Sequence, residues 1–245
     1  RVYVASDKYL LIFDTAGDEL FRIKLPDSPN CLAVDENGKV YLGMENHVVV
    51  YNADLKRKSE WPQISPNSII TSIAVSSNRV FVADAGMFAV YCFDKLGSRI
   101  WKTEKGSADK NFRGFVIPSP YFDLALDSDG YLWVVNPGKH EFCSFNSAGT
   151  LRSSWHNTSI SLQGFSGCCN PTHFAFLSDD SIVTSEKGIV RVKVHGPSGA
   201  FSTVVASPAK FSEDTVGLDL AVDSKQNIWI LDPYTSTLRL FAKKE

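Results

Sequence analysis

The chain has little of what would assign it to a specialised class of protein. No apolar run approaches the roughly 20 residues that a membrane-spanning helix needs, so no membrane span is expected. Its 27 acidic and 25 basic residues leave a formal net charge of −2, which gives no general attraction to nucleic acid. Five cysteines among 245 residues are too few for a disulfide scaffold. What remains is a globular chain in which 44% of residues are hydrophobic, enough for a sizeable core.

Enzyme motifs are scarce as well. The sequence has no Ser-His-Asp order, no phosphate-binding loop and no dinucleotide-binding fingerprint. It begins at Arg1 without a signal-like segment, and we expect that a native N-terminal segment precedes it. These features favour a non-catalytic protein, and we expect a monomer that needs no cofactor.

A unit of roughly 40 to 50 residues recurs along the chain. Clear copies are CLAVDENGKVYLG from Cys31, SIAVSSNRVFVAD from Ser72, DLALDSDGYLWVVN from Asp123 and DLAVDSKQNIWILD from Asp219, and HFAFLSDDSIVTSE from His173 is a weaker copy. Each copy has an apolar stretch, a turn rich in Asp, Ser, Asn and Gly, and a second stretch of β-branched and aromatic residues. Further alternating stretches follow. Period-two alternation bounded by turn residues predicts strands.

Six such units predict an all-β fold, a six-bladed β-propeller of four-stranded antiparallel blades, with residues 1–245 as a single domain. The two end units are incomplete. RVYVAS at Arg1 corresponds to the second strand of the unit, and the last unit lacks an outermost strand. Either native residues before Arg1 complete the first blade, or both terminal blades have three strands.

The repeating unit, apolar-Ala-Val-Asp followed by a Gly-containing turn and Tyr-Val-Ala-Asp-like strand, resembles the NHL repeat over nearly the whole chain. The resemblance implies a six-bladed propeller, a fold that serves ubiquitin-ligase scaffolds, RNA binders, an amidating lyase and bacterial extracytoplasmic binding proteins. The resemblance does not select a function among these. We expect an extracytoplasmic location, periplasmic or secreted. The lyase has zinc-binding histidines two residues before the apolar-Ala pair, and none of the matching residues here is histidine: Asn30, Thr71, Phe122, Thr172 and Leu218.

Three long insertions are predicted on one face of the propeller. They span residues 105–122, 156–172 and 207–217, in the links that lead into blades four, five and six. Long loops in a compact domain are often functional, and these contain aromatic residues and proline. We expect ordered loops around a ligand pocket on this face.

Several polar residues on the insertion face are candidate ligand contacts. Glu186 and Lys187 lie where the second strand of blade five ends, although a solvated turn would explain them equally well. Asn136 ends the same strand of blade four, and acidic or amide side chains there often bond local backbone instead. The predicted ligand-binding set is Arg113, Asn136, His140, Cys168, Cys169, Asn170, Glu186 and Lys187.

The adjacent cysteines in GFSGCCNPTHFAF lie in the second insertion. Zinc sites and thioredoxin-type pairs both need cysteines that are further apart in sequence. Two interpretations stay open. Cys168 and Cys169 are small buried hydrophobic residues, or they form a vicinal disulfide that offers a rigid apolar platform to a flat or sugar-like ligand.

A metal site is a further hypothesis. Asp123, His173 and Asp219 open the inner strands of three consecutive blades, and carboxylate with imidazole is a plausible donor set for a divalent metal. The alternative is that each residue caps its strand and bonds an adjacent blade.

Three functions follow from these patterns. The favoured one is a non-catalytic propeller that holds a small ligand or a partner protein on the insertion face of blades four to six. The second is a metal-assisted hydrolase or lyase that uses the Asp/His cluster. RNA binding is the third and is disfavoured: Lys102, Lys105, Lys110 and Arg113 form a local basic run, but no basic face interleaved with aromatic residues is expected to cover this side of the propeller.

Overall fold

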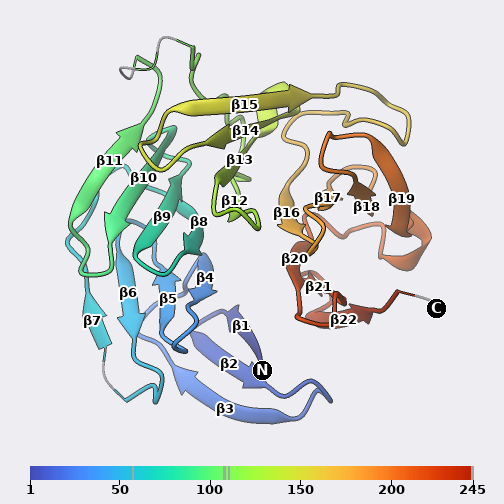
Figure 1. The fold of residues 1–245 in the computed structure, drawn as a ribbon. Helices are drawn as coiled ribbons and strands as arrows, with labels where there is room; N and C mark the ends of the chain where they lie inside the picture. Colours follow the sequence, from blue (N-terminus) through green and yellow to red (C-terminus); the bar gives the residue numbers. More distant parts are fainter. Residues whose placement is uncertain (57, 107–108, 110, 244–245) are drawn as a thin grey trace. The chain divides into compact units, whose positions relative to one another are not determined.

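The computed structural model describes residues 1–56, 58–106, 109 and 111–243. Lys110 of the basic run therefore lies outside the described residues. Within them the chain is all-β, as Figure 1 shows, and helix is limited to two three-residue 3-10 turns, η1 (Pro137–Lys139) and η2 (Pro208–Lys210). No helix in this part of the chain is long and apolar enough to cross a membrane. The chain divides into two compact units, Arg1–Lys102 and Thr103–Glu245, called unit 1 and unit 2 below.

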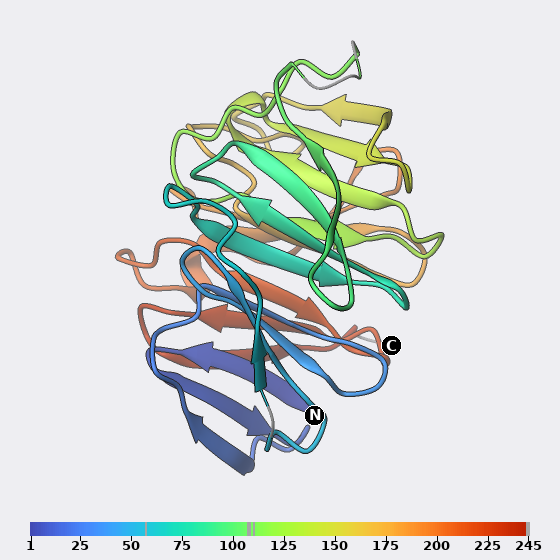
Figure 2. The same ribbon diagram turned by 90° about the vertical axis from the view of Figure 1, so that its left-hand side faces the viewer.

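Unit 1 contains three antiparallel sheets, blades 1 to 3, whose strands appear as successive hairpins in Figure 2. Blade 1 has three strands, β1 (Val2–Ser6), β2 (Tyr9–Phe13) and β3 (Glu19–Lys24). Blade 2 consists of β4 (Cys31–Val34), β5 (Val40–Gly43), β6 (Val48–Tyr51) and β7 (Lys58–Glu60). Blade 3 consists of β8 (Ile70–Val75), β9 (Arg79–Asp84), β10 (Ala89–Asp94) and β11 (Arg99–Thr103), whose last residue belongs to unit 2.

Unit 2 contains blades 4 to 6, built in the same way. Blade 4 consists of β12 (Leu124–Leu126), β13 (Leu132–Asn136), β14 (Glu141–Phe145) and β15 (Leu151–His156). Blade 5 consists of β16 (His173–Phe176), β17 (Ile182–Glu186), β18 (Arg191–His195) and β19 (Phe201–Ala206). Blade 6 has three strands, β20 (Asp219–Val222), β21 (Ile228–Asp232) and β22 (Thr237–Phe241).

The fold-class prediction is confirmed: the chain has the all-β, six-bladed β-propeller fold. Four of the described sheets have the four strands expected, and the two terminal sheets have three. Both alternatives for the incomplete end units stay predictions, because the sequence starts at Arg1. Whether residues 1–245 act as a single domain stays a prediction.

The cores lie between neighbouring blades of the same unit. In unit 2, one buried cluster joins Trp133, Val135 and Phe142 of blade 4 to Phe174 and Ile182 of blade 5. A second buried cluster joins blade 5 to blade 6, and unit 1 has two comparable clusters. Because side chains alternate along a strand, a central strand can present apolar side chains to the neighbouring blade, as Trp133 and Val135 of β13 do. This packing fixes where the connecting loops emerge.

One turn recurs in blades 2, 4 and 6. An aspartate after the first strand accepts backbone N–H groups of its own turn and bonds an aromatic side chain six residues later. The Trp133 Nε1–H donates to Asp127 Oδ2 at 2.8 Å, the Trp229 Nε1–H to Asp223 Oδ2 at 3.1 Å, and the Tyr41 hydroxyl to Asp35 Oδ2 at 3.4 Å. At Asp223 burial alone would raise the pKa, but hydrogen bonds from Asn227 and Trp229 outweigh it and lower the pKa to about 2.

Candidate functional site

The loops of unit 2 gather on two opposite faces. The insertion face contains the links that precede blades 4, 5 and 6 and the loops between second and third strands. The turn face contains the short turns around residues 127–131, 146–150, 177–181, 196–200 and 223–227. Hydrogen bonds connect blades on the turn face, since Ser128 bonds both carboxylate oxygens of Asp180, and the Ser178 amide donates to Gln226.

The first insertion is held by Asn136, at the end of β13. Its Oδ1 accepts the Val116 amide at 2.7 Å, and its Nδ2 donates to Glu141 at 3.0 Å. Asn136 is fully buried. Its buried side chain therefore positions the loop through hydrogen bonds and does not face solvent. Arg113, in the same insertion, is exposed to solvent. Residues 107, 108 and 110 of this insertion lie outside the described residues.

The second insertion is held by a buried ionic cluster, called the anchor cluster, of Glu186, Arg191 and Lys193. Glu186 is 1% exposed, and its carboxylate accepts two hydrogen bonds from the Arg191 guanidinium, at 2.8 and 3.0 Å. The Lys193 ammonium lies 2.8 Å from the same carboxylate. In this conformation Glu186 does not reach the surface, so the structure does not place it beside the other candidate ligand contacts.

The two cations of the anchor cluster donate to backbone carbonyls of residues 157–165. The accepting oxygens belong to Ser161 for Arg191, and to Leu162 and Gly164 for Lys193, at 3.4, 3.2 and 2.7 Å. The Lys193 ammonium also lies 4.5 Å from the centroid of the buried Phe165 ring. Burial lowers the pKa of Lys193, and its hydrogen bond to Glu186 opposes that shift. The insertion is thus fixed through its main chain by charges that water does not reach.

Sequence reasoning did not identify Arg191 and Lys193. The available signal was the stretch VRVKVH, in which alternate positions of a central strand are cationic instead of apolar. Such residues are rarely buried unless they are paired. The acidic partner of both, Glu186, ends the adjacent strand, where it pairs with Arg191 across the sheet.

The GCCNP turn is joined to its surroundings by three of the predicted residues. The Asn170 side chain donates to the carbonyl of Lys187 at 3.0 Å and accepts the Lys187 amide at 2.9 Å. The His140 ring lies 2.6 Å from the Gly167 carbonyl and 3.0 Å from the Thr158 hydroxyl. The structure therefore brings His140, Asn170 and Lys187 together around this turn.

The two cysteines of the turn differ in exposure. Cys168 is exposed and Cys169 is fully buried, and both are free thiols. Cys169 has a φ of 68°, in the left-handed region that few side chains adopt. Cys168 thus departs from the expectation of two buried residues, and a vicinal disulfide stays a prediction.

Lys187 connects two insertions. Its ammonium donates to the Ser119 hydroxyl at 3.2 Å and lies 4.8 Å from the centroid of the Tyr121 ring. Tyr121 in turn packs edge-on against His173, with ring centroids 5.9 Å apart. Lys187 is half-buried and already engaged, so a ligand would have to compete with these contacts.

The three candidate metal ligands do not converge. Asp123 accepts the backbone amides of Leu124 and of Phe174 in the next blade, both at 2.9 Å, as expected for a strand cap. Asp219 is exposed and bonds the Leu220 amide. Among the residues that the structure describes, no group of three or more His, Cys, Asp or Glu side chains could hold a metal ion. The metal hypothesis therefore stays a prediction without geometric support.

Within the described part of unit 2, the exposed large apolar side chains lie on the insertion face, except for Leu240 of β22. Ile160 is 80% exposed, and Val216 and Tyr234 are each 57% exposed. Leu162, Ile189 and Val116 are between 43% and 47% exposed and belong to the same set of loops. The phenol of Tyr234 donates to Asp214 at 3.0 Å, which fixes its ring. Rigid loops that present apolar side chains to solvent are typical of binding surfaces.

Comparison with known proteins establishes the fold. No protein-family model and no curated protein matches the chain. A Bacteroides thetaiotaomicron protein of unknown function aligns with a TM-score of 0.70 at 13% identity, over 98% of this chain and 65% of that one. A catalytically inactive virginiamycin B lyase from Staphylococcus aureus, with quinupristin, aligns with a TM-score of 0.65 at 13% identity, over 97% of this chain and 74% of that one.

The extracellular domain of a protein assigned as a hybrid two-component system from Bacteroides thetaiotaomicron gives a TM-score of 0.63 at 14% identity, over 98% of this chain and 30% of that one. The resemblance to NHL repeats stays a prediction. At these identities the solved structures show what this chain is similar to in fold, a six-bladed β-propeller, and nothing about its activity.

Proposed function

We propose that this protein is a non-catalytic binding propeller that takes a partner protein on the insertion face of unit 2. The observation that supports this is the placement of Val116, Ile160, Leu162, Ile189, Val216 and Tyr234 on loops of that one face. Apolar groups exposed to this extent cost free energy in water, and a partner that covers them recovers it.

The rigidity of the loops supports the same proposal. The anchor cluster holds residues 157–165 by their carbonyls, and Asn170 holds the next turn to Lys187. A surface that is ordered before binding loses less conformational entropy when the partner arrives. Such preorganisation is of use to a protein that recognises a fixed shape.

A partner protein is favoured over a small ligand by how the apolar groups are distributed. They come from three insertions and two shorter loops, and the most exposed of them, Ile160, is only one-fifth covered by the chain itself. Small ligands are usually enclosed in concave sites, whereas protein interfaces use spread apolar groups with a polar rim. We also place the protein outside the cytoplasm, in line with the extracellular domain among its structural neighbours.

The test compares two leucines of equal exposure. Leu162 in the second insertion and Leu240 in β22 are both 47% exposed. Immobilised native chain, an Ile160→Asp/Leu162→Asp variant and a Leu240→Asp variant are exposed to a source extract, and retained proteins are quantified by mass spectrometry. The purified partner should then bind the double variant at least about tenfold more weakly, a loss of 1.4 kcal/mol or more, and the Leu240→Asp variant as tightly as native.

Two results would contradict the proposal. One is a partner that binds the double variant and native chain equally. The other is a stoichiometric metal in the purified protein together with turnover of a substrate, which would favour the metal-assisted enzyme.

A further inference from the structure

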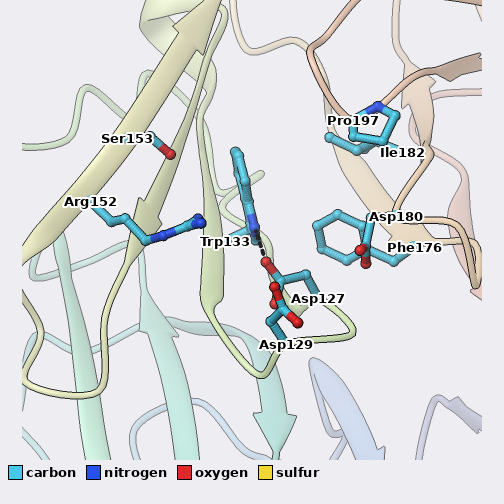
Figure 3. A pocket seen from close by; sticks show the side chains of 9 residues that line it. All are labelled: Asp127, Asp129, Trp133, Arg152, Ser153, Phe176, Asp180, Ile182 and Pro197. Atoms are coloured by element: carbon cyan, nitrogen blue, oxygen red, sulfur yellow. Dashed lines mark hydrogen bonds between the residues drawn. The ribbon is translucent and has the colours of Figure 1, made fainter.

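A second, separate site lies on the turn face of unit 2. A pocket of about 270 Å³ opens there between blades 4 and 5 (Figure 3). Figure 3 shows Trp133 facing Phe176, Ile182 and Pro197 across an open space, with the Asp127 and Asp129 carboxylates at one end. The volume equals that of roughly nine water molecules at about 30 Å³ each, which suffices for a small organic molecule or one long side chain.

The equivalent place in unit 1 is filled by an ammonium group. The Lys95 Nζ lies 3.2 Å from Asp35 Oδ2 and 5.2 Å from the centroid of the Tyr41 ring. The Asp35 side chain is only 5% exposed and that of Lys95 21% exposed. An aromatic face and a carboxylate thus hold a cation in a partly desolvated position, where both interactions gain strength.

Register shows that the two places correspond. Tyr41 pairs with Ala33 across the first two strands of blade 2, and Trp133 pairs with Ala125 in blade 4. Each is bonded by the aspartate six positions before it, Asp35 and Asp127. The aspartate and the aromatic ring therefore occupy the same positions in the two blades.

The opposing turns also correspond, with one change. In blade 3 the turn runs from Asp94, whose amide donates to Ser98, and Lys95 is its second residue. In blade 5 the turn runs from Gly196, whose amide donates to Ala200, and Pro197 is its second residue. Pro197 thus occupies the position that Lys95 occupies in unit 1. Because proline has no ammonium group to fill the space beside Asp127 and Trp133, a pocket is present there.

We propose that this pocket binds a cationic amine or guanidinium group on an apolar stem, from a free amine or from a basic side chain of a peptide. The cation lies between the Asp127 carboxylate and the Trp133 ring, as Lys95 lies between Asp35 and Tyr41. The stem packs on Ile182, Pro197 and Phe176.

The charges around the pocket agree with this assignment. Three carboxylates line it, those of Asp127, Asp129 and Asp180, against one guanidinium, that of Arg152. Arg152 stacks 3.9 Å above the Tyr131 ring and lies 3.5 Å from the Ser144 hydroxyl. Asp127 and Asp180 accept hydrogen bonds only from neutral donors among the described residues, namely Tyr131, Trp133 and Ser128. Each carboxylate oxygen has a second lone pair for a cationic donor.

The experiment follows the Trp133 indole N–H by NMR while n-butylammonium is added, with n-butanol as the neutral probe of the same stem. Saturable shifts with n-butylammonium and about tenfold weaker or no binding of n-butanol are expected, because a hydrogen bond to a charged group contributes about 1.5–3 kcal/mol. A peptide with one lysine, and its norleucine counterpart, give the second arm. Binding of the lysine peptide alone would assign the cation to a peptide side chain.

Four variants make the test decisive. Asp127→Asn keeps an oxygen for the turn amides but removes the charge, and should weaken n-butylammonium binding about tenfold. Pro197→Lys supplies a tethered ammonium and should abolish binding. Lys95→Ala should create a second amine site in unit 1. Asp223→Asn changes the same turn in blade 6 and should leave the affinity unchanged.

Equal binding of n-butanol and n-butylammonium, or the absence of any shift with both amine probes, would overturn the proposal. So would a Pro197→Lys variant that binds n-butylammonium as tightly as the native chain. The Ile160→Asp/Leu162→Asp variant should bind n-butylammonium normally. The two sites can therefore fail independently of one another.

Discussion

The hairpins β9–β10 in unit 1 and β17–β18 in unit 2 are labelled in Figure 1. They share one register and differ in chemistry. Asp84 pairs with Ala89 beside the connecting loop of the first hairpin, and Glu186 pairs with Arg191 at the same place in the second. Further along, Tyr91 and Phe93 correspond to Lys193 and His195, and Lys95 beyond the strand corresponds to Pro197. The same backbone thus supports an aromatic hairpin in one unit and a charged one in the other.

The difference follows from the link that each hairpin must hold. In blade 3 the link between β7 and β8 is short, and Asp84 Oδ1 directly accepts the amides of Ile69 at 2.9 Å and Met87 at 3.1 Å. In blade 5 the link between β15 and β16 is longer and turns its carbonyls towards the hairpin. Carbonyls need donors, so Arg191 and Lys193 reach them, and Glu186 neutralises the two cations. The longer insertion is accommodated by two added donors, Arg191 and Lys193, beside an acidic acceptor that both hairpins keep.

The largest expected effect is on the anchor cluster. Glu186→Ala leaves two buried cations without a counterion and should lower the free energy of unfolding by about 3–5 kcal/mol. Asp84→Ala removes the acceptor of two backbone amides and should lower it by about 1–3 kcal/mol. Denaturant unfolding of both variants measures the two losses in free energy of unfolding. If the loss for Glu186→Ala were equal to or smaller than that for Asp84→Ala, the charged hairpin would not depend on its counterion more than the aromatic hairpin depends on Asp84.

A variant that transfers residues of blade 3 to blade 5 tests stability and the order of the insertion loop separately. The triple variant Glu186→Leu, Arg191→Ala and Lys193→Tyr removes all three charges and gives the two cationic positions of blade 5 the residues of blade 3, Ala89 and Tyr91. Replacing a whole buried ionic cluster is often neutral for stability, so the blades should remain folded. Amide exchange at residues 157–165 should nevertheless accelerate, because their carbonyls lose their donors.

The second effect is a pH dependence that comes from His195 of blade 5, where blade 3 has Phe93. Burial, and then the nearby Lys193 charge, lower the pKa of His195 to about 4. Its Nδ1 lies 3.2 Å from the Gly199 carbonyl, and the ring is fully buried beside Phe165. Protons therefore bind the unfolded chain more tightly than the folded one. The free energy of unfolding, as far as His195 affects it, is highest above pH 6.5. It decreases as the pH drops towards 4 and is constant below pH 4.

The loss across that range should be about 3 kcal/mol, at 1.36 kcal/mol for each pKa unit. His195→Phe, which copies Phe93 of blade 3, should remove this part of the slope while the carboxylates of the chain titrate as before. Unfolding free energies of native chain and variant between pH 4 and 7 give the comparison. Parallel curves would show that His195 titrates normally.

The smallest effect is the coupling of Asp35 to Lys95. Their pair is partly exposed, and a double-mutant cycle with Asp35→Asn and Lys95→Ala should give about 1 kcal/mol. In unit 2, Pro197→Lys should acquire a similar coupling to Asp127, measured by the cycle with Asp127→Asn. A coupling energy near zero in both units would mean that the aspartate does not bind the cation. The Asp35–Lys95 pair would then no longer support cation binding beside Asp127.

The sequence by itself determined the blades and their turns. Alternation of period two and the six-residue spacing from Asp35 to Tyr41, or from Asp127 to Trp133, act within a single hairpin, so local pattern suffices to predict them. The insertion face and its loops also followed from the repeat, because an antiparallel meander sends alternate loops to opposite ends.

Tertiary structure alone decided what the candidate residues do. Glu186 looked like a loop-tip ligand contact, and it is buried because Arg191 and Lys193 of the neighbouring strand turn inwards to it. Asp123 looked like a metal ligand, and it caps the next blade through Phe174. The pocket at Asp127 depends on Pro197, which lies far away in sequence. Such pairings depend on which side chains meet across strands and blades. The free-energy cost of burying a charge depends on whether an oppositely charged partner lies beside it.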